Sequence, residues 1–315
     1  MDRNTLFTVL KNNISNLSLD EFVAEFITKT QAIEEFYKLC NGISAGKTIS
    51  LLFNPHRLSI DTEKDDLSVY ESLQVDDKLS GLARLYLYNL EHGVNNAFYN
   101  TIQRGYQNIQ YVNEFPPFIA RTIYQTFCKT EKIKILDPCA GWGGRMIGAA
   151  SIPNTYYVAC EPSTRTFNGL LKLRDWLKQM QPTFDGNIHC IPFEDFSIDE
   201  KFDIALTSPP YYDTEHYSDE ETNSLNRYHS FDDWVVGFYE PLIVHTVNYL
   251  TDNGIFILNI GDRKYPLSEE LDKICKKHGF HVERIKDYLS GNGDNKEKFY
   301  GISKKRKFVT RRALF

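Results

Sequence analysis

Residues 134–150 read KILDPCAGWGGRMIGAA, and this stretch decides the fold. A short apolar strand is predicted to end at Asp137, a glycine turn follows, and a helix begins near Gly144. Gly141 and Gly143 allow the backbone to come close to a ligand, and the N-terminus of the helix favours a negative group there. Because the ligands of open α/β sheets bind at the carboxyl ends of strands, we expect this turn to form part of a binding site.

The glycine turn has two other interpretations. A dinucleotide-binding turn reads G-x-G-x-x-G, and Met146 stands where the third glycine belongs, which weakens that interpretation without eliminating it. An ordinary tight connection between a strand and a helix is the other alternative. The next predicted strand favours a ligand site, because it ends at Glu161, 20 positions after Gly141, where a carboxylate can accept from both hydroxyls of a ribose. A charge at a helix start is the alternative role for Glu161.

The chain around this stretch alternates between short apolar runs, several of them β-branched, and helical patterns. This alternation predicts an α/β fold with a mostly parallel sheet and helices on both of its faces. Two final strands are expected to close the sheet edge as an antiparallel pair. The predicted strands are residues 133–136, 156–160, 188–191, 204–206, 255–260, 282–288 and 307–310, and the predicted helices include residues 167–177, 234–250 and 267–275.

Residues 1–110 have a different pattern, which predicts a mainly helical region. Apolar residues recur at spacings of three and four in residues 19–37 and 79–90, and Ser18 is a suitable helix cap. Residues 61–66 (DTEKDD) are an expected loop between these patterns.

A tripeptide within this region invites a nucleotide-binding interpretation. Gly46-Lys47-Thr48 matches the end of a phosphate-binding loop, but Asn41 stands where that loop needs its first glycine. We therefore expect a turn that connects two helices.

Residues 201–212 read KFDIALTSPPYY and form the second informative stretch. A strand is predicted to end at Thr207, and two successive prolines then fix the backbone φ and remove two N–H donors. The carbonyl groups before and between the prolines therefore point outward without a strand partner, beside the ring of Tyr211. Fixed acceptors next to a stacking surface suit a flat group that carries an amine, such as a flipped nucleobase. The alternative is that the prolines only turn the chain.

The two motifs together carry a resemblance. Asp137-Pro-x-x-Gly141-x-Gly143, followed by Ser208-Pro-Pro-Tyr211, resembles the S-adenosylmethionine-dependent DNA amino-methyltransferases, which modify the exocyclic amine of cytosine or adenine. Residues 113–121 (NEFPPFIAR) are similar to the helix that flanks the methionine end of the cofactor in that family. The resemblance covers about residues 107–310. It implies a Rossmann-like methyltransferase sheet with an antiparallel edge strand.

The resemblance implies two domains and a cofactor site. A catalytic domain is expected at residues 106–315, and a mainly helical region at residues 1–105 is a candidate for target recognition. S-adenosylmethionine is the expected cofactor, and no metal is expected. Its ribose would meet Glu161, and its adenine amine would meet Glu194 or Asp195. The expected cofactor-binding residues are Phe115, Asp137, Gly141, Gly143, Glu161, Glu194 and Asp195. Trp142 departs from the small residue that is usual between the two glycines.

The same resemblance implies a mechanism. The target base would be flipped out of duplex DNA and stacked on Tyr211, and its amine would donate to Ser208 and to the carbonyl of Pro209. The nitrogen then attacks the sulfonium methyl directly, so no covalent enzyme intermediate is needed. Serine at the first motif position slightly favours cytosine N4 over adenine N6. The expected catalytic residues are Ser208, Pro209, Pro210 and Tyr211.

Other functions compete with this one. The first is an RNA-base or protein methyltransferase on the same fold. The second is a non-catalytic nucleic-acid-binding subunit, which the intact motifs disfavour. The target site, any restriction partner and the oligomeric state are not set by the sequence.

The polar stretch at residues 213–227 (DTEHYSDEETNSLNR) follows the second motif. It has two interpretations, a mobile loop that closes over the target base or a solvated connection. His216 and His229 lie in or beside it, and lone histidines are more often surface residues than catalysts. Asp232 and Asp233 follow Ser230 and suit a helix N-terminus.

The charge of the chain is unevenly distributed. The 315 residues carry a net charge of −6, and residues 291–315 hold 8 basic against 2 acidic side chains, so the remaining body carries −12. One interpretation of this basic tail is a solvated terminus, and the other is a DNA-phosphate contact on an acidic protein. The tail residues concerned are Lys304, Lys305, Arg306, Lys307, Arg311 and Arg312.

Composition narrows the class of protein. The 42% hydrophobic and 25% charged residues are typical of a globular chain and exclude disorder and low complexity. Six scattered cysteines without a C-x-x-C pair disfavour a disulfide scaffold or a structural zinc site. The sequence has no apolar stretch long enough for a membrane span and no signal peptide, so a cytoplasmic location is expected.

Overall fold

The computed structural model describes residues 2–62, 67–104, 112–262, 264–285 and 298–305. Contacts between residues divide the chain into two compact units. The first comprises residues 1–114 together with residues 215–217, and the second comprises residues 115–214 together with residues 218–315. The boundary that the sequence suggested, at residue 105, falls outside the described residues, so the two-domain division at that point stays a prediction.

The first unit is mainly helical, as expected. Ser18 and Thr28 each begin a helix with a reciprocal capping box, in which the side chain of the cap and that of the third helical residue satisfy each other's backbone N–H groups. A stacked pair of rings, Phe26 and Phe98, lies in its core with centroids 4.1 Å apart. Its helices are α1 (Arg3–Asn16), α2 (Leu19–Phe26), α3 (Lys29–Cys40), α4 (Ile49–Phe53), α5 (Val69–Ser72), α6 (Asp76–Glu91) and α7 (Ala97–Arg104), with the 3₁₀ helix η1 (Pro55–Ser59).

Two short segments of this unit can be compared with what the sequence predicted. The Gly46-Lys47-Thr48 tripeptide connects α3 to α4, and the backbone N–H groups of Gly46 and Thr48 both donate to Oε2 of Glu35, at 2.9 and 3.3 Å. Those groups are therefore occupied by a carboxylate, and the predicted turn between helices is confirmed. Of the expected loop at residues 61–66, residues 61–62 form strand β1 (Asp61–Thr62), which pairs with β6 (Glu215–His216), and residues 63–66 lie outside the described part.

The second unit is built on a seven-stranded sheet, and the expected Rossmann-like arrangement, a mostly parallel sheet with helices on both faces, is confirmed. The strand order is β4-β3-β2-β5-β7-β9-β8, which places the two motif-bearing strands β2 and β5 side by side at the centre. All neighbouring pairs are parallel except those that involve β9. The strands are β2 (Ile133–Asp137), β3 (Thr155–Cys160), β4 (Asp185–His189), β5 (Phe202–Thr207), β7 (Leu250–Ile260), β8 (His281–Ile285) and β9 (Lys298–Ser303).

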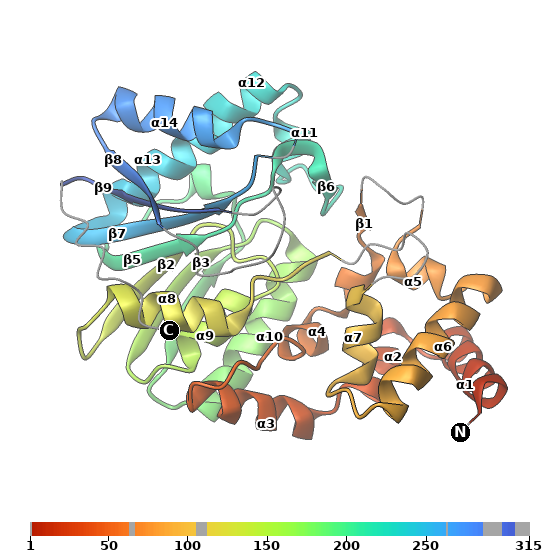
Figure 1. The fold of residues 1–315 in the computed structure, drawn as a ribbon. Coiled ribbons are helices and arrows are strands. Elements are labelled where there is room, and N and C mark those ends of the chain that lie inside the picture. Colours follow the sequence, from red (N-terminus) through yellow and green to blue (C-terminus); the bar gives the residue numbers. More distant parts are fainter. Residues whose placement is uncertain (1, 63–66, 105–111, 263, 286–297, 306–315) are drawn as a thin grey trace. The chain divides into compact units, whose positions relative to one another are not determined.

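Helices cover both faces of this sheet (Figure 1). The first face carries α8 (Pro117–Phe127), α9 (Gly144–Ala150) and α10 (Thr164–Met180). The other face carries α13 (Glu240–Tyr249) and α14 (Leu267–His278), which bury a cluster of apolar side chains against the strands. Shorter elements connect these: η2 (Phe193–Asp195), η3 (Tyr212–Thr214), α11 (Ser224–Arg227), α12 (Phe231–Trp234) and the π-helical turn η4 (Val235–Tyr239). None of the helices in the described ranges is long and apolar enough to cross a membrane.

Several strands differ in position from their expected ranges, and β7, for example, begins at Leu250, five residues before the expected Ile255. The partner of β8 is β9 at residues 298–303, and the expected range 307–310 lies outside the described residues. The antiparallel strand is therefore one position in from the edge, since β8 itself forms the border. Strand β4 begins at Asp185, three residues before the expected Ile188, because it is the other edge strand and alternates exposed with buried side chains.

Candidate functional site

The carboxyl ends of β2 and β5 are joined directly. These strands pair in parallel with Ile135 opposite Ile204, so the residues that end them lie side by side. The hydroxyl of Thr207 donates to Oδ1 of Asp137 at 2.9 Å, and it accepts from the backbone N–H of Cys139 at 3.2 Å. The glycine turn and the Ser-Pro-Pro-Tyr motif are thus brought together at one edge of the sheet, where ligands of such sheets bind.

Asp137 is the centre of a buried polar network. Its side chain is 0% exposed and forms an ion pair with Arg145, whose Nε lies 2.7 Å from Oδ2. The Tyr157 hydroxyl donates to the same oxygen at 2.5 Å. With Thr207 and the Cys139 N–H on Oδ1, the carboxylate has protein donors on both oxygens. Asp137 therefore holds the turn in shape for a ligand.

Arg145 is a site residue that the sequence analysis missed. It also donates to the carbonyl of Cys139, and its guanidinium carbon lies 5.3 Å from the ring centroid of Phe115. These contacts tie the expected cofactor residue Phe115, which precedes α8, to the start of α9. The available signal was a lone arginine in the helix segment GRMIGAA, all of whose residues are buried. A buried charge of this kind requires a partner.

The two glycines of the turn are required for different reasons. Gly141 has φ +55° and Gly143 has φ +95°, a region that favours glycine. A Cβ on Gly143 would lie 2.6 Å from Cδ2 of Leu173 on α10, so this glycine lets the turn pack closely. A Cβ on Gly141 would meet nothing closer than the Cys139 carbonyl at 4.0 Å. Trp142, between them, points inward and is 7% exposed.

Glu161 lies against this turn, as the 20-residue spacing suggested. Its Oε2 accepts from the N–H of Gly141 at 3.0 Å, and its Oε1 accepts from the N–H of Ser163 at 3.1 Å. The side chain is buried, and burial raises the pKa of this carboxyl to about 7. The carboxylate is therefore oriented by the backbone, and no basic side chain of the described residues forms an ion pair with it.

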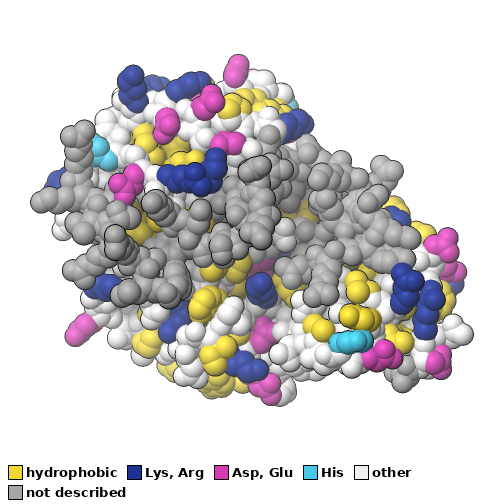
Figure 2. Space-filling model, in the orientation of Figure 1, with side chains coloured by type: hydrophobic (Ala, Val, Ile, Leu, Met, Phe, Trp, Pro, Cys, Tyr) yellow, Lys and Arg dark blue, Asp and Glu magenta, His cyan; other side chains and the backbone are white. Residues whose placement is uncertain are grey.

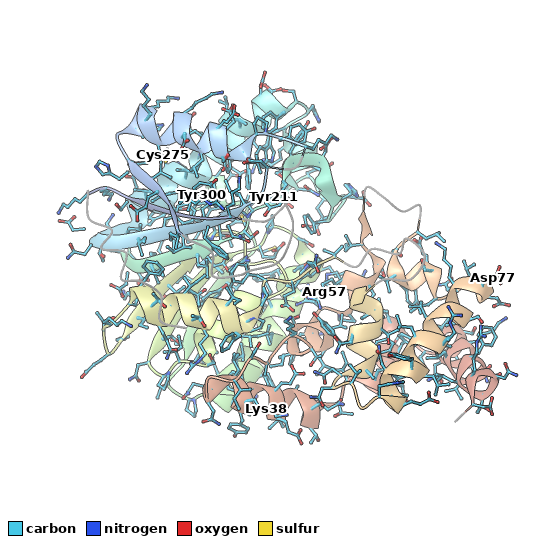
Figure 3. The ribbon with its side chains drawn as sticks, in the orientation of Figure 1. Lys38, Arg57, Asp77, Tyr211, Cys275 and Tyr300 are labelled. Atoms are coloured by element: carbon cyan, nitrogen blue, oxygen red, sulfur yellow. The ribbon has the colours of Figure 1, made fainter. Side chains whose placement is uncertain are left out.

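The Ser-Pro-Pro-Tyr motif follows β5 without a break. Pro209 is buried, whereas Ser208, Pro210 and Tyr211 are half-buried. The ring of Tyr211, labelled in Figure 3, packs partly against the core cluster of the sheet. The next residue, Tyr212, has φ +55°, which is rare for a residue with a side chain and frequent at functional sites.

Aromatic rings hold Tyr212 in this conformation. Its ring packs edge-on against Phe231 and Tyr265, with centroids 5.9 and 5.2 Å away. Phe231 and Tyr265 are themselves stacked at 4.4 Å. The backbone after the motif is therefore fixed by packing, which keeps the two prolines in one geometry.

Glu194 and Asp195 differ sharply in environment. Nη1 of Arg227 lies 2.9 Å from Oε1 of Glu194 and 2.8 Å from Oδ2 of Asp195. The side chain of Glu194 is 5% exposed and that of Asp195 is 50% exposed. Burial raises the pKa of Glu194. Its second oxygen, Oε2, is buried and has no hydrogen-bond partner among the described residues. Glu194 thus offers an enclosed acceptor, and Asp195 does not.

The thiol nearest to the site is Cys139, in the glycine turn. Burial raises the pKa of this thiol well above its usual value. A neutral thiol is a poor nucleophile. Across the described ranges, no group of three or more His, Cys, Asp or Glu residues could hold a metal ion.

The basic tail begins at the amino ends of the parallel strands, on the opposite side of the sheet from their carboxyl ends. Because β9 is antiparallel to β7, it ends beside the amino ends of its neighbours. Nζ of Lys304 lies 3.4 Å from the carbonyl of Asn248, just before β7, and Lys305 pairs with Asp252 at 2.9 Å. Tyr211 follows the carboxyl end of β5. Arg306, Lys307, Arg311 and Arg312 lie outside the described residues.

The described surface charges are mixed in sign. On the face drawn in Figure 2, Lys and Arg side chains are interspersed with Asp and Glu side chains among the atoms that are coloured. His216 and His229 are exposed, as is usual for lone histidines. Asp232 and Asp233 lie in the first turn of α12, which is capped by Ser230, whose hydroxyl accepts from the Asp233 N–H at 3.1 Å.

Comparisons with known proteins give distant structural similarities. No protein-family model and no curated protein matches the chain. A protein assigned as a class I S-adenosylmethionine-dependent methyltransferase from Listeria monocytogenes matches with 15% identity and a TM-score of 0.47, over 99% of this chain and 91% of its own. An S-adenosylmethionine-dependent methyltransferase from Agrobacterium tumefaciens matches with 11% identity and a TM-score of 0.44, over 64% and 66%. Precorrin-6y C5,15-methyltransferase from Geobacter metallireducens matches with 16% identity and a TM-score of 0.41, over 65% and 96%.

Proposed function

We propose that this chain is an S-adenosylmethionine-dependent DNA methyltransferase that modifies the exocyclic amine of a flipped base, with cytosine N4 favoured over adenine N6. One observation carries the proposal. The hydroxyl of Thr207, the last residue of β5, donates to Asp137 and accepts from the Cys139 N–H, so a cofactor-type glycine turn and a Ser-Pro-Pro-Tyr motif lie together at the carboxyl ends of the strands. A methyl donor and an amine acceptor bound at these two motifs would be neighbours, which is what transfer between them requires.

The residues at the turn fit S-adenosylmethionine. A Cβ on Gly141 would meet only the Cys139 carbonyl, at 4.0 Å, so the turn leaves room there for the methionine end. Glu161 is oriented by two backbone N–H groups and retains acceptor capacity for ribose hydroxyls. Asp137 and Arg145 bind the backbone of the turn at Cys139. When bound, the cofactor supplies an electrophilic methyl group.

Glu194, rather than Asp195, is the proposed acceptor for the adenine amine. The sequence did not distinguish them. The buried Oε2 of Glu194 lacks a hydrogen-bond partner among the described residues, and leaving such an oxygen unmatched costs about 1–3 kcal/mol. An amine donor would remove that cost, whereas the exposed carboxylate of Asp195 is already solvated.

The motif residues would hold the target amine. Ser208 offers a hydroxyl oxygen and Pro209 a carbonyl, and neither proline adds an N–H donor that would repel the amine. Tyr211 offers a half-buried ring for stacking. Together they would orient the nitrogen lone pair toward the methyl, so catalysis would come from positioning and fixed dipoles.

RNA-base or protein methylation is the second candidate. The observation that favours it is the position of Lys304 and Lys305. They lie near the amino end of β7, whereas Tyr211 follows the carboxyl end of β5. Phosphate contacts by this part of the tail would therefore not lie beside the flipped base. We also propose that residues 1–105 supply target recognition and that the basic tail assists them. Deletion of residues 1–105 tests this proposal, because it should change DNA affinity or target choice.

Mass spectrometry of nucleosides tests the proposed function. DNA and RNA from cells that express the chain are digested and compared with those from cells that express the Ser208→Ala variant. We expect N4-methylcytosine, or else N6-methyladenine, in DNA only from the wild-type culture. A methylated base confined to RNA would establish the second candidate, and an unmodified nucleic acid pool with methylated protein would exclude both nucleobase functions.

Cofactor affinity is expected to depend on pH through Glu161. Ribose hydroxyls donate to the ionised carboxylate, so binding requires the proton to leave. Because burial raises the pKa of Glu161 to about 7, the affinity should fall as the pH falls below that value, by up to about tenfold per pH unit. Titration calorimetry with S-adenosylhomocysteine between pH 5 and 8 measures this. Glu161→Gln should bind more weakly and show a flat profile, and a wild-type affinity independent of pH would contradict this role.

A further inference from the structure

Residues 218–228, here called the strap, are fastened to the end of β3. Glu220 accepts from the N–H and the hydroxyl of Thr164, at 2.9 and 2.7 Å. The hydroxyl of Thr222 donates to the carbonyl of Pro162 at 3.0 Å. Pro162 and Thr164 follow Glu161 directly, so this end of the strap lies beside the proposed ribose contact.

The other end of the strap is fastened after β4. Arg227 pairs with both Glu194 and Asp195. The hydroxyl of Tyr228 lies 3.2 Å from Oε1 of Glu194 and 2.8 Å from the carbonyl of Gly237. A Cβ on Gly237 would lie 2.1 Å from the Tyr228 ring, so that ring fits against the π-helical turn η4 only because residue 237 is a glycine. Such π-helical turns occur often at functional sites.

The strap also has internal order. The amide of Asn223 donates to the carbonyl of Ser218 at 2.6 Å, and that of Asn226 donates to the carbonyl of Glu220 at 2.8 Å. The indole N–H of Trp234 donates to the hydroxyl of Ser224 at 3.2 Å. The strap is therefore a folded segment that is held at both ends by hydrogen bonds and ion pairs.

We propose that the strap closes the adenosine end of the cofactor site, and that Arg227 is the positioning residue that fastens it and orients Glu194. This inference rests on the proposed function. The two anchor points, Pro162–Thr164 and Glu194–Asp195, follow the two strands that would hold ribose and adenine. By pairing with Oε1, Arg227 leaves Oε2 as the free acceptor for the adenine amine. Cofactor exchange then requires at least one anchor to release.

Exchange kinetics test the role of Arg227. The dissociation rate of S-adenosylhomocysteine is measured by stopped-flow for the wild type, Arg227→Ala and Arg227→Lys. Arg174→Ala is the matched control, because Arg174 pairs with its neighbour Asp175 on the surface of α10. We expect Arg227→Ala to raise the dissociation rate about tenfold or more, because changes at a binding site act mainly on dissociation. Arg227→Lys should restore part of the wild-type rate, and Arg174→Ala should not differ from the wild type.

A second measurement separates positioning from general loosening. S-inosylhomocysteine carries an oxygen in place of the adenine amine, so an oriented acceptor at Glu194 should reject it. We expect the wild type to prefer S-adenosylhomocysteine strongly and Arg227→Ala to lose most of this preference.

Failure of the proposed function and failure of the strap inference would give different results. A wild type that binds neither compound would contradict the proposed function itself. A wild type that binds, with equal dissociation rates and equal discrimination in Arg227→Ala and Arg174→Ala, would overturn the strap. If Arg227→Ala does not fold, Glu220→Ala releases the anchor at Thr164 instead, and it should raise the dissociation rate while keeping the discrimination. An unchanged rate in that variant would equally overturn the inference.

Discussion

Ser208→Ala is expected to lower the rate of methyl transfer by about 10²–10³-fold while leaving cofactor affinity close to that of the wild type. Removing one preorganised polar group that acts on the reacting atoms has an effect of this size. Ser208 follows β5 directly, and among the described residues it forms no hydrogen bond with the glycine turn. Its hydroxyl should therefore matter to the target amine and little to S-adenosylmethionine.

The measurement is single-turnover transfer of labelled methyl to duplex DNA, with cofactor affinity measured in parallel. Ser197→Ala is the control, because Ser197 is exposed and lies in the connection between η2 and β5. A Pro209→Ala variant, which gains an N–H donor and backbone freedom, should show a similar loss. If Ser208→Ala transfers methyl at the rate of Ser197→Ala, the hydroxyl has no part in the reaction.

Asp137→Asn is expected to lower the free energy of unfolding of the second unit by about 3–5 kcal/mol. The substitution leaves the guanidinium of Arg145 buried without its counter-charge, and it removes an acceptor from the Tyr157 and Thr207 hydroxyls. All three tryptophans, Trp142, Trp176 and Trp234, belong to this unit, so urea unfolding followed by tryptophan fluorescence reports on it alone.

Asp185→Asn serves as the matched control for this variant. Asp185 pairs with Lys178 on the surface, with side chains 61% and 47% exposed, and such pairs contribute less than about 1 kcal/mol. If Asp137→Asn unfolds at the same urea concentration as this control, the network beneath the glycine turn has no structural role. Loss of stability in both variants to the same extent would have the same meaning.

Most of the framework of the candidate site could be predicted from local sequence patterns. The strand that ends at Asp137, the glycine turn and the helix that follows are specified within residues 134–150, and the structure has them there. The pattern also places both motifs at the carboxyl ends of parallel strands, whereas the pairing of β2 with β5 that joins them comes from the structure. The roles of the site residues in binding and catalysis stay predictions.

Arg145 and the strap could not be predicted in this way. Arg145 contacts residues at the end of β2 and before α8. The strap contacts residues that lie about 30 to 60 positions earlier in the chain. Sequence spacing carries no signal for such contacts. The same holds for the choice between Glu194 and Asp195, which are adjacent in the chain and differ only in what surrounds them.

The sequence by itself determined the sheet, its central motifs and the helical character of the first unit, because these depend on hydrophobic periodicity, helix caps and the special conformations of glycine and proline. Only the tertiary structure decided what lies beside the site. It placed Lys304 and Lys305 at the far edge through the antiparallel direction of β9, and it folded the acidic and polar strap onto the ends of β3 and β4. The physical reason is that strand direction and the pairing of buried charges are settled by long-range packing, which no local pattern records.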